Sequence, residues 1–166
     1  MNWVHIHLAT NHLPVVGLPL LVLILGLGAW RRQAVVVQLA LGLLTSLSMA
    51  AIAVKFTGDF AVPQLPPSFT SLKDLVNHHE AHGDQATTAV FGLGLLTGIT
   101  WIRCRPGRPA PTWLLALILL VGVVTCGLYL RTAGSGGEIS HPEIRSKALA
   151  DSPAASNVAK RLGLIR

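Results

Sequence analysis

Four long apolar runs are the feature that most constrains how this chain can fold. They cover residues 13–30, 34–54, 86–102 and 113–130, and none of them contains Asp, Glu, Lys or Arg. A helix crosses a bilayer with about 20 mostly apolar residues, in a range of roughly 17–25. Helix is required because backbone polar groups cannot be left unpaired in hydrocarbon. The sequence therefore predicts an all-α protein, with a four-helix transmembrane bundle in residues 1–131.

The few charged residues predict the orientation of the bundle in a membrane. Only 12% of the chain is charged, whereas soluble domains carry about 25%. Five arginines lie in the two short connections between spans: Arg31, Arg32, Arg103, Arg105 and Arg108. They lack the interleaved aromatic residues of a nucleic-acid surface, which excludes nucleic acid as a partner, and they match the positive-inside rule for cytoplasmic loops. We expect a bacterial inner-membrane protein with both termini on the outer, periplasmic side.

The segments between the spans carry weaker signals. Ser71 and Asp74 resemble a capping box, which predicts a helical lead-in over 71–85 that continues into the third span. Residues 132–166 are expected to form a periplasmic tail. Within this tail, the glycine-rich stretch from Thr132 to Ser140 is expected to be extended.

All seven histidines fall on the predicted outer side of the membrane. They are His5, His7, His12, His78, His79, His82 and His141. Histidine is the commonest nitrogen ligand of metals and also binds haem iron. On a helix, His79 lies in the apolar stripe of Leu72, Leu75 and Val76, with Gly83 and Ala86 leaving room beside its ring. This pattern predicts a cofactor site at the outer face.

Two kinds of cofactor fit the histidines. A haem b would take His12 and His79 as axial ligands, from adjacent helices at one depth, with His141 binding a second cofactor or hydrogen-bonding. A copper or zinc ion would use candidate ligands from a wider set: His5, His7, His78, His82 and Glu80. His78 and His82 are spaced i and i+4, which suits a shared divalent ion. Interfacial histidines without a cofactor remain the alternative interpretation.

The position of the histidines limits the function. None lies in the inner half of a span, so a bound haem would exchange electrons at the outer face, with a quinol or a periplasmic electron carrier. A cofactor-free structural subunit of a larger membrane complex, or a homo-oligomer, is the alternative. A transporter is disfavoured because the span interiors carry no charged residue.

Four motifs resemble those of a bacterial family of small four-helix membrane proteins that is loosely grouped with cytochrome b-like proteins. They are N-H-L-P-V-V-G at 11–17, F-T-G-D at 56–59, H-H-E at 78–80 and T-A-G-S-G-G-E-I-S-H-P-E-I-R at 132–145. The resemblance covers residues 11–145. It implies a bundle in which His12, His79 with Glu80, and His141 with Glu143 are the pattern positions.

Overall fold

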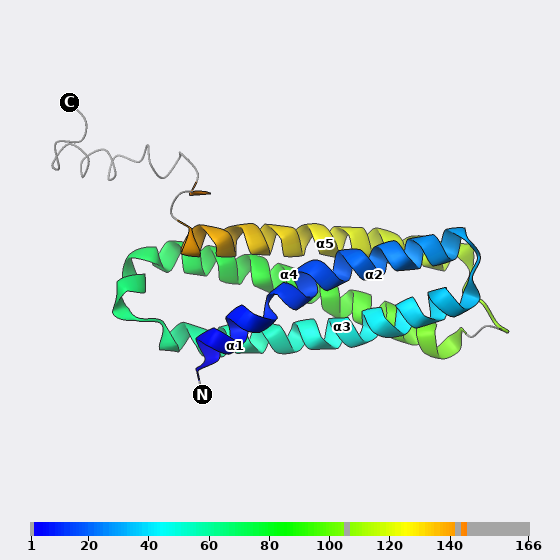
Figure 1. Cartoon of the computed structure of the whole chain (residues 1–166), viewed down its shortest axis with the longest axis horizontal. Coiled ribbons are helices and arrows are strands. Elements are labelled where there is room, and N and C mark those ends of the chain that lie inside the picture. Colours follow the sequence, from blue (N-terminus) through cyan, green and yellow to red (C-terminus); the bar gives the residue numbers. More distant parts are fainter. Residues whose placement is uncertain (1, 105–106, 142–143, 146–166) are drawn as a thin grey trace, which may run out of the picture.

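The computed structural model describes residues 2–104, 107–141 and 144–145 of the 166-residue chain. Within these residues the protein is all-α, as predicted, and its helices form one elongated bundle (Figure 1). The elements in chain order are α1 (Trp3–Thr10), α2 (His12–Trp30), α3 (Ala34–Ala61), the 3-10 turns η1 (Val62–Gln64) and η2 (Pro67–Leu72), α4 (Lys73–Arg103) and α5 (Thr112–Ser140). α1 and α2 together make the first of the four long helical segments.

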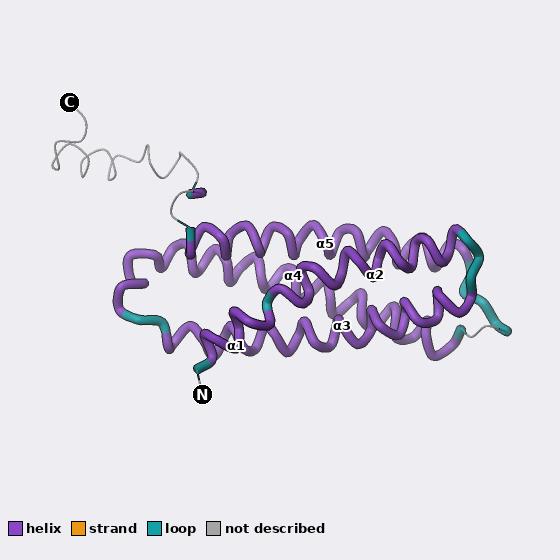
Figure 2. The backbone as a smooth tube through the Cα atoms, viewed as in Figure 1, coloured by secondary structure: helices purple, strands orange, loops and turns teal. Residues whose placement is uncertain are grey.

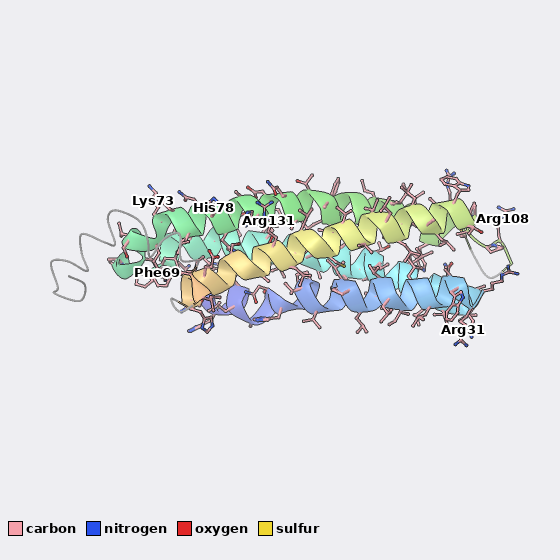
Figure 3. The ribbon with its side chains drawn as sticks, turned by 90° about the horizontal axis from the view of Figure 1, so that it is seen from above. Arg31, Phe69, Lys73, His78, Arg108 and Arg131 are labelled. Carbon is pink, nitrogen blue, oxygen red and sulfur yellow. The ribbon has the colours of Figure 1, made fainter. Side chains whose placement is uncertain are left out.

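The four segments pack side by side in a square. α2 contacts α3 and α5, and α4 contacts the same two helices, so that α2 and α4 lie diagonally opposite each other. Apolar side chains of all four segments fill the centre, where Leu18, Leu41, Leu93 and Ile118 are fully buried. The short connections α2–α3 and α4–α5 lie at one end of the bundle (Figure 2). We call this the arginine end, because Arg31 and Arg108 lie there (Figure 3), and the opposite end, where α1 lies and α3 passes into α4, the histidine end.

The helices are long and apolar enough to make this a multi-pass membrane protein. Four candidate spans cover Trp3–Trp30, Ala34–Gln64, Phe69–Arg103 and Thr112–Ser140. Large apolar side chains point outward along the whole length, as lipid contact requires; Leu20 is 55% exposed and Leu23 is 59% exposed. The helices extend beyond the predicted spans, chiefly at the histidine end.

Two predicted segments differ from the structure. The stretch Thr132–Ser140, for which the sequence predicts an extended chain, forms the last part of α5. Helix α3 also continues to Ala61, beyond the end of the predicted span at residue 54. The glycines of α5 do not end the helix because its carbonyls remain paired, up to the bond from the His141 N–H to the Gly137 carbonyl. The remainder of the predicted tail, residues 146–166, lies outside the described residues.

Proline breaks the first segment near the histidine end. α1 ends at Thr10 and α2 begins at His12, two positions before Pro14. Pro14 has no N–H to bond the carbonyl of Thr10, and its ring crowds that carbonyl. The break lets α1 pack along α3 (Figure 1).

Small residues set the close approach of neighbouring helices. A Cβ built on Gly94 of α4 would lie 2.8 Å from Cβ of Ser48, and one on Gly98 would lie 3.2 Å from a methyl of Thr45. Gly94 and Gly98 therefore let α4 pack closely against α3. A Cβ built on Gly122 of α5 would likewise lie 2.8 Å from a methyl of Val22.

The bundle consists of two similar helical hairpins, α1–α2–α3 and α4–α5. When the sequences of α2 and α4 are aligned without a gap, four buried positions coincide: Pro14 with Ala86, Leu18 with Val90, Leu25 with Thr97 and Gly28 with Thr100. The same alignment of α3 with α5 pairs Ala40 with Ile118, Leu44 with Gly122, Leu47 with Thr125 and Ala51 with Tyr129. Because equivalent helices lie diagonally, an approximate two-fold axis runs along the centre of the bundle.

Candidate cofactor site

Two histidines from diagonally opposite helical segments lie close together at the histidine end. The ring centroids of His7, on α1, and His79, on α4, are 6.5 Å apart and their planes are inclined at 72°. α2 ends at Trp30 and α4 ends at Arg103, both at the arginine end. The number of residues from His7 to Trp30 is nearly the same as the number from His79 to Arg103. At a rise of about 1.5 Å per residue, both rings lie roughly 35 Å from the arginine end. They therefore occupy the same depth.

Each imidazole is hydrogen-bonded to the second long helix of its hairpin, which is α3 for His7 and α5 for His79. Nδ1 of His7 lies 3.3 Å from the carbonyl oxygen of Val54 and 3.1 Å from the Thr57 hydroxyl. Nδ1 of His79 lies 3.0 Å from the carbonyl oxygen of Thr132 and 3.2 Å from the Ser135 hydroxyl. For each ring, we call the carbonyl and the hydroxyl together its cradle. The two cradles occupy equivalent positions when α3 is aligned with α5.

The hydrogen bonds determine the tautomer of both rings. A carbonyl oxygen only accepts, so the Nδ1 of each ring carries the proton and donates it. Nε2 then keeps its lone pair. Metal-binding histidines are held in this way by a bond from their second ring nitrogen.

A glycine lies against each ring. A Cβ built on Gly58 would lie 3.0 Å from Cε1 of His7, and one on Gly136 would lie 3.0 Å from Cε1 of His79. Since ordinary carbon contacts are about 3.5–4.0 Å, any larger residue would press on the ring. Glycine at these two positions lets the helix backbone approach the imidazole.

The two rings line a cavity of about 440 Å³, which is bounded mainly by apolar atoms. Gly83 also lines it, and no atom lies within 4 Å of the place where a Cβ on Gly83 would be, which confirms the room expected beside His79. Buried Tyr129 lines the same cavity. Asn11 contributes a buried Oδ1 for which the described residues supply no hydrogen-bond partner.

An ion-pair cluster lies at the rim of the cavity. Lys55 of α3 is paired with Asp59, one turn on, and with Asp84 of α4 at 3.1 Å. The Lys55 side chain is 21% exposed. The cluster joins α3 to α4 next to the cavity.

The structure places the other predicted site residues in two groups. His12, Glu80 and His141 line the cavity with His7 and His79, although His12 and His141 are exposed. His5, His78 and His82 lie outside its lining. Among the described residues, no three His, Cys, Asp or Glu side chains are close enough to hold a metal ion together. Glu143 lies outside the described residues.

The ring opposite His79 is that of His7, whereas the sequence favours His12 as the partner of His79. The two histidines also come from diagonal helices rather than adjacent ones. His7 precedes buried Pro14 by about two helical turns, as His79 precedes buried Ala86, so the apolar-stripe criterion that selects His79 also selects His7. The cradle residues were not identified from the sequence. The signal for them is the hydroxyl–glycine pair that occurs at equivalent positions of α3 and α5, as Thr57-Gly58 and Ser135-Gly136.

Comparison with protein-family models, with curated proteins and with solved structures finds no match in any of the three. The resemblance of the motifs to cytochrome b-like proteins therefore stays a prediction. The structure nevertheless places those motifs around one cavity. F-T-G-D supplies Thr57 and Gly58, H-H-E supplies His79, and the α5 motif supplies Thr132, Ser135 and Gly136.

Proposed function

We propose that the protein binds a haem b between His7 and His79 and serves as a small electron-transfer or quinol-facing subunit at the periplasmic face of a bacterial inner membrane. The observation that carries the proposal is the pair of imidazoles from opposite segments, with centroids 6.5 Å apart and each Nδ1 hydrogen-bonded to a carbonyl. His7 replaces His12 as the proposed axial partner of His79.

The separation of the rings supports two nitrogens on opposite sides of one metal. With metal–nitrogen bonds of roughly 2.0–2.1 Å and ring centres about 1.1 Å behind each nitrogen, trans imidazoles have centroids about 6.3 Å apart. The same bonds at a tetrahedral angle would bring the centroids to about 5.2 Å. The observed 6.5 Å matches the trans arrangement. A haem would be held between the Nε2 atoms of His7 and His79.

The surroundings suit a prosthetic group. A volume of about 440 Å³ lies within the range of roughly 300–1,000 Å³ typical of ligand sites. Gly83 leaves the wall beside His79 open to a flat macrocycle. The Val54 and Thr132 carbonyls keep both Nε2 atoms unprotonated and therefore able to bind iron. A bound haem would supply one-electron chemistry.

The depth of the pair supports a role at one face. The apolar core of a bilayer is about 30 Å thick, and the rings lie roughly 35 Å from the arginine end. If the arginine end is cytoplasmic, as the positive-inside rule favours, the site lies at the periplasmic interface. A membrane quinol or a periplasmic carrier can approach a cofactor there.

Spectroscopy on protein purified from its native membranes tests the proposal. The wild type is expected to show b-type bands in a reduced-minus-oxidised spectrum and one haem per chain by pyridine haemochrome. His7→Ala and His79→Ala should each lose most of this haem. His5→Ala, an exposed histidine on the same helix as His7, and His12→Ala should retain it.

Four results would contradict the haem assignment or the choice of its ligands. A wild-type protein without haem would do so directly, as would copper or zinc found by elemental analysis in place of iron. Full haem content in both His7→Ala and His79→Ala would show that the pair is not the site. Loss in His12→Ala with retention in His7→Ala would restore the pairing expected from the sequence.

A further inference from the structure

A second pair of histidines lies on the outer surface of α4, away from the cavity. His78 and His82 are one helical turn apart, with ring centroids at 5.3 Å and planes at 78°. His78 is exposed and His82 is half-buried. Figure 3 shows His78 at the histidine end, on the same part of the bundle as Arg131.

The equivalent positions of the first hairpin carry no imidazoles. Aligning the two hairpins places His78 on Ile6 and His82 on Thr10. In the first hairpin the Thr10 hydroxyl donates to the carbonyl of Ile6, and the helix packs without a side-chain ligand. The pair of His78 and His82 is therefore a feature of one hairpin and not of the arrangement that the two hairpins share.

One ring nitrogen of this pair has no partner. Nδ1 of His82 is buried and makes no hydrogen bond with the described residues. A buried polar atom without a partner lowers stability. By contrast, Nδ1 of His79, on the same helix, has both a carbonyl and a hydroxyl partner.

The ring separation distinguishes the two histidine pairs. Imidazoles bound to one metal at a tetrahedral angle have centroids about 5.2 Å apart, and His78 and His82 have 5.3 Å. His7 and His79, at 6.5 Å, are too far apart for a shared metal at that angle. Histidines at i and i+4 on one helix can both bind one divalent ion.

We propose that His78 and His82 bind a divalent transition-metal ion such as Zn²⁺ or Cu²⁺ at the surface of the histidine end. The site has two protein ligands, and water supplies the rest of the coordination shell, since no third protein ligand lies close enough among the described residues. Two charged groups of α5 act on His82: Arg131 opposes a bound cation and Glu138 favours it. The proposal does not depend on the haem.

Calorimetric titration with Zn²⁺ tests the site in full-length protein that has been treated with a chelator and kept in detergent. Replacement of either ligand, in His78→Ala or His82→Ala, should weaken binding by about tenfold or more. His5→Ala, an exposed histidine elsewhere, should bind as the wild type does. Arg131→Gln should bind Zn²⁺ more tightly, because it removes a positive charge beside the ion.

The exposed position of His78 keeps the test decisive. His78→Ala removes a solvent-facing ring, so it should fold and keep its haem even if His82→Ala does not. Zn²⁺ should raise the thermal stability of the wild type, because it binds the folded state, and should fail to do so in His78→Ala. Equal Zn²⁺ affinity in the wild type and His78→Ala would overturn the proposal, whatever the haem content of either protein.

Discussion

Replacing Gly136 by alanine should dislodge His79 while leaving the helix intact. The new Cβ would lie 3.0 Å from Cε1 and 3.3 Å from Nδ1 of the ring. To restore a carbon contact of about 3.5 Å, the ring must move by about 0.5 Å. The bond from Nδ1 to the Thr132 carbonyl, now 3.0 Å, would then lengthen toward about 3.5 Å, where hydrogen bonding is largely lost.

The free-energy change follows from two opposing effects. An alanine in a helix interior is more favourable than glycine by about 1 kcal/mol. Losing a part-buried hydrogen bond costs about 1–3 kcal/mol. Gly134, two positions away on α5, has nothing within 4 Å of a Cβ, so Gly134→Ala should show only the favourable effect. We expect Gly136→Ala to be about 1–3 kcal/mol less stable than Gly134→Ala.

Thermal unfolding and haem content measured on the same samples provide the assay. Gly136→Ala should unfold at a lower temperature than Gly134→Ala and should hold less haem, because an axial ligand must be positioned to within about 0.5 Å. Gly58→Ala should behave like Gly136→Ala, since its Cβ would meet His7 at the same distance. If Gly136→Ala and Gly134→Ala have the same stability and haem content, the cradle does not position His79 and the reasoning is refuted.

Three further predictions concern other parts of the bundle. Lys55→Met leaves two aspartates unpaired where α3 meets α4, so it should lower stability by about 1 kcal/mol, measured by thermal unfolding at low salt; no change would show that the cluster is not structural. Gly94→Ala should destabilise the protein and Gly92→Ala should not, because only the first Cβ would meet α3 closely; equal melting temperatures would contradict this. Axial imidazoles at 72° should give haem a highly anisotropic low-spin ferric EPR signal, and a signal typical of parallel rings would contradict the pairing of His7 with His79.

The sequence alone determines that the protein is a four-helix membrane bundle. Four uncharged runs of spanning length admit no other structure in hydrocarbon, because each helix pairs its own backbone groups. The open space beside His79 and the placement of His79 in an apolar stripe also follow from helical periodicity. These features depend on the spacing of residues along a single helix. Spacing along one helix is directly visible in a sequence.

Only the tertiary structure decides which histidines meet. The choice of His7 over His12 depends on the break before Pro14, which turns α1 toward α3, and on the diagonal placement of α2 and α4. The two cradles depend on α3 and α5 passing behind the rings at matching depth, with a glycine at each contact. Such contacts join residues that are far apart in the sequence. Their geometry is set by how whole helices pack, and helix periodicity carries no information about that packing.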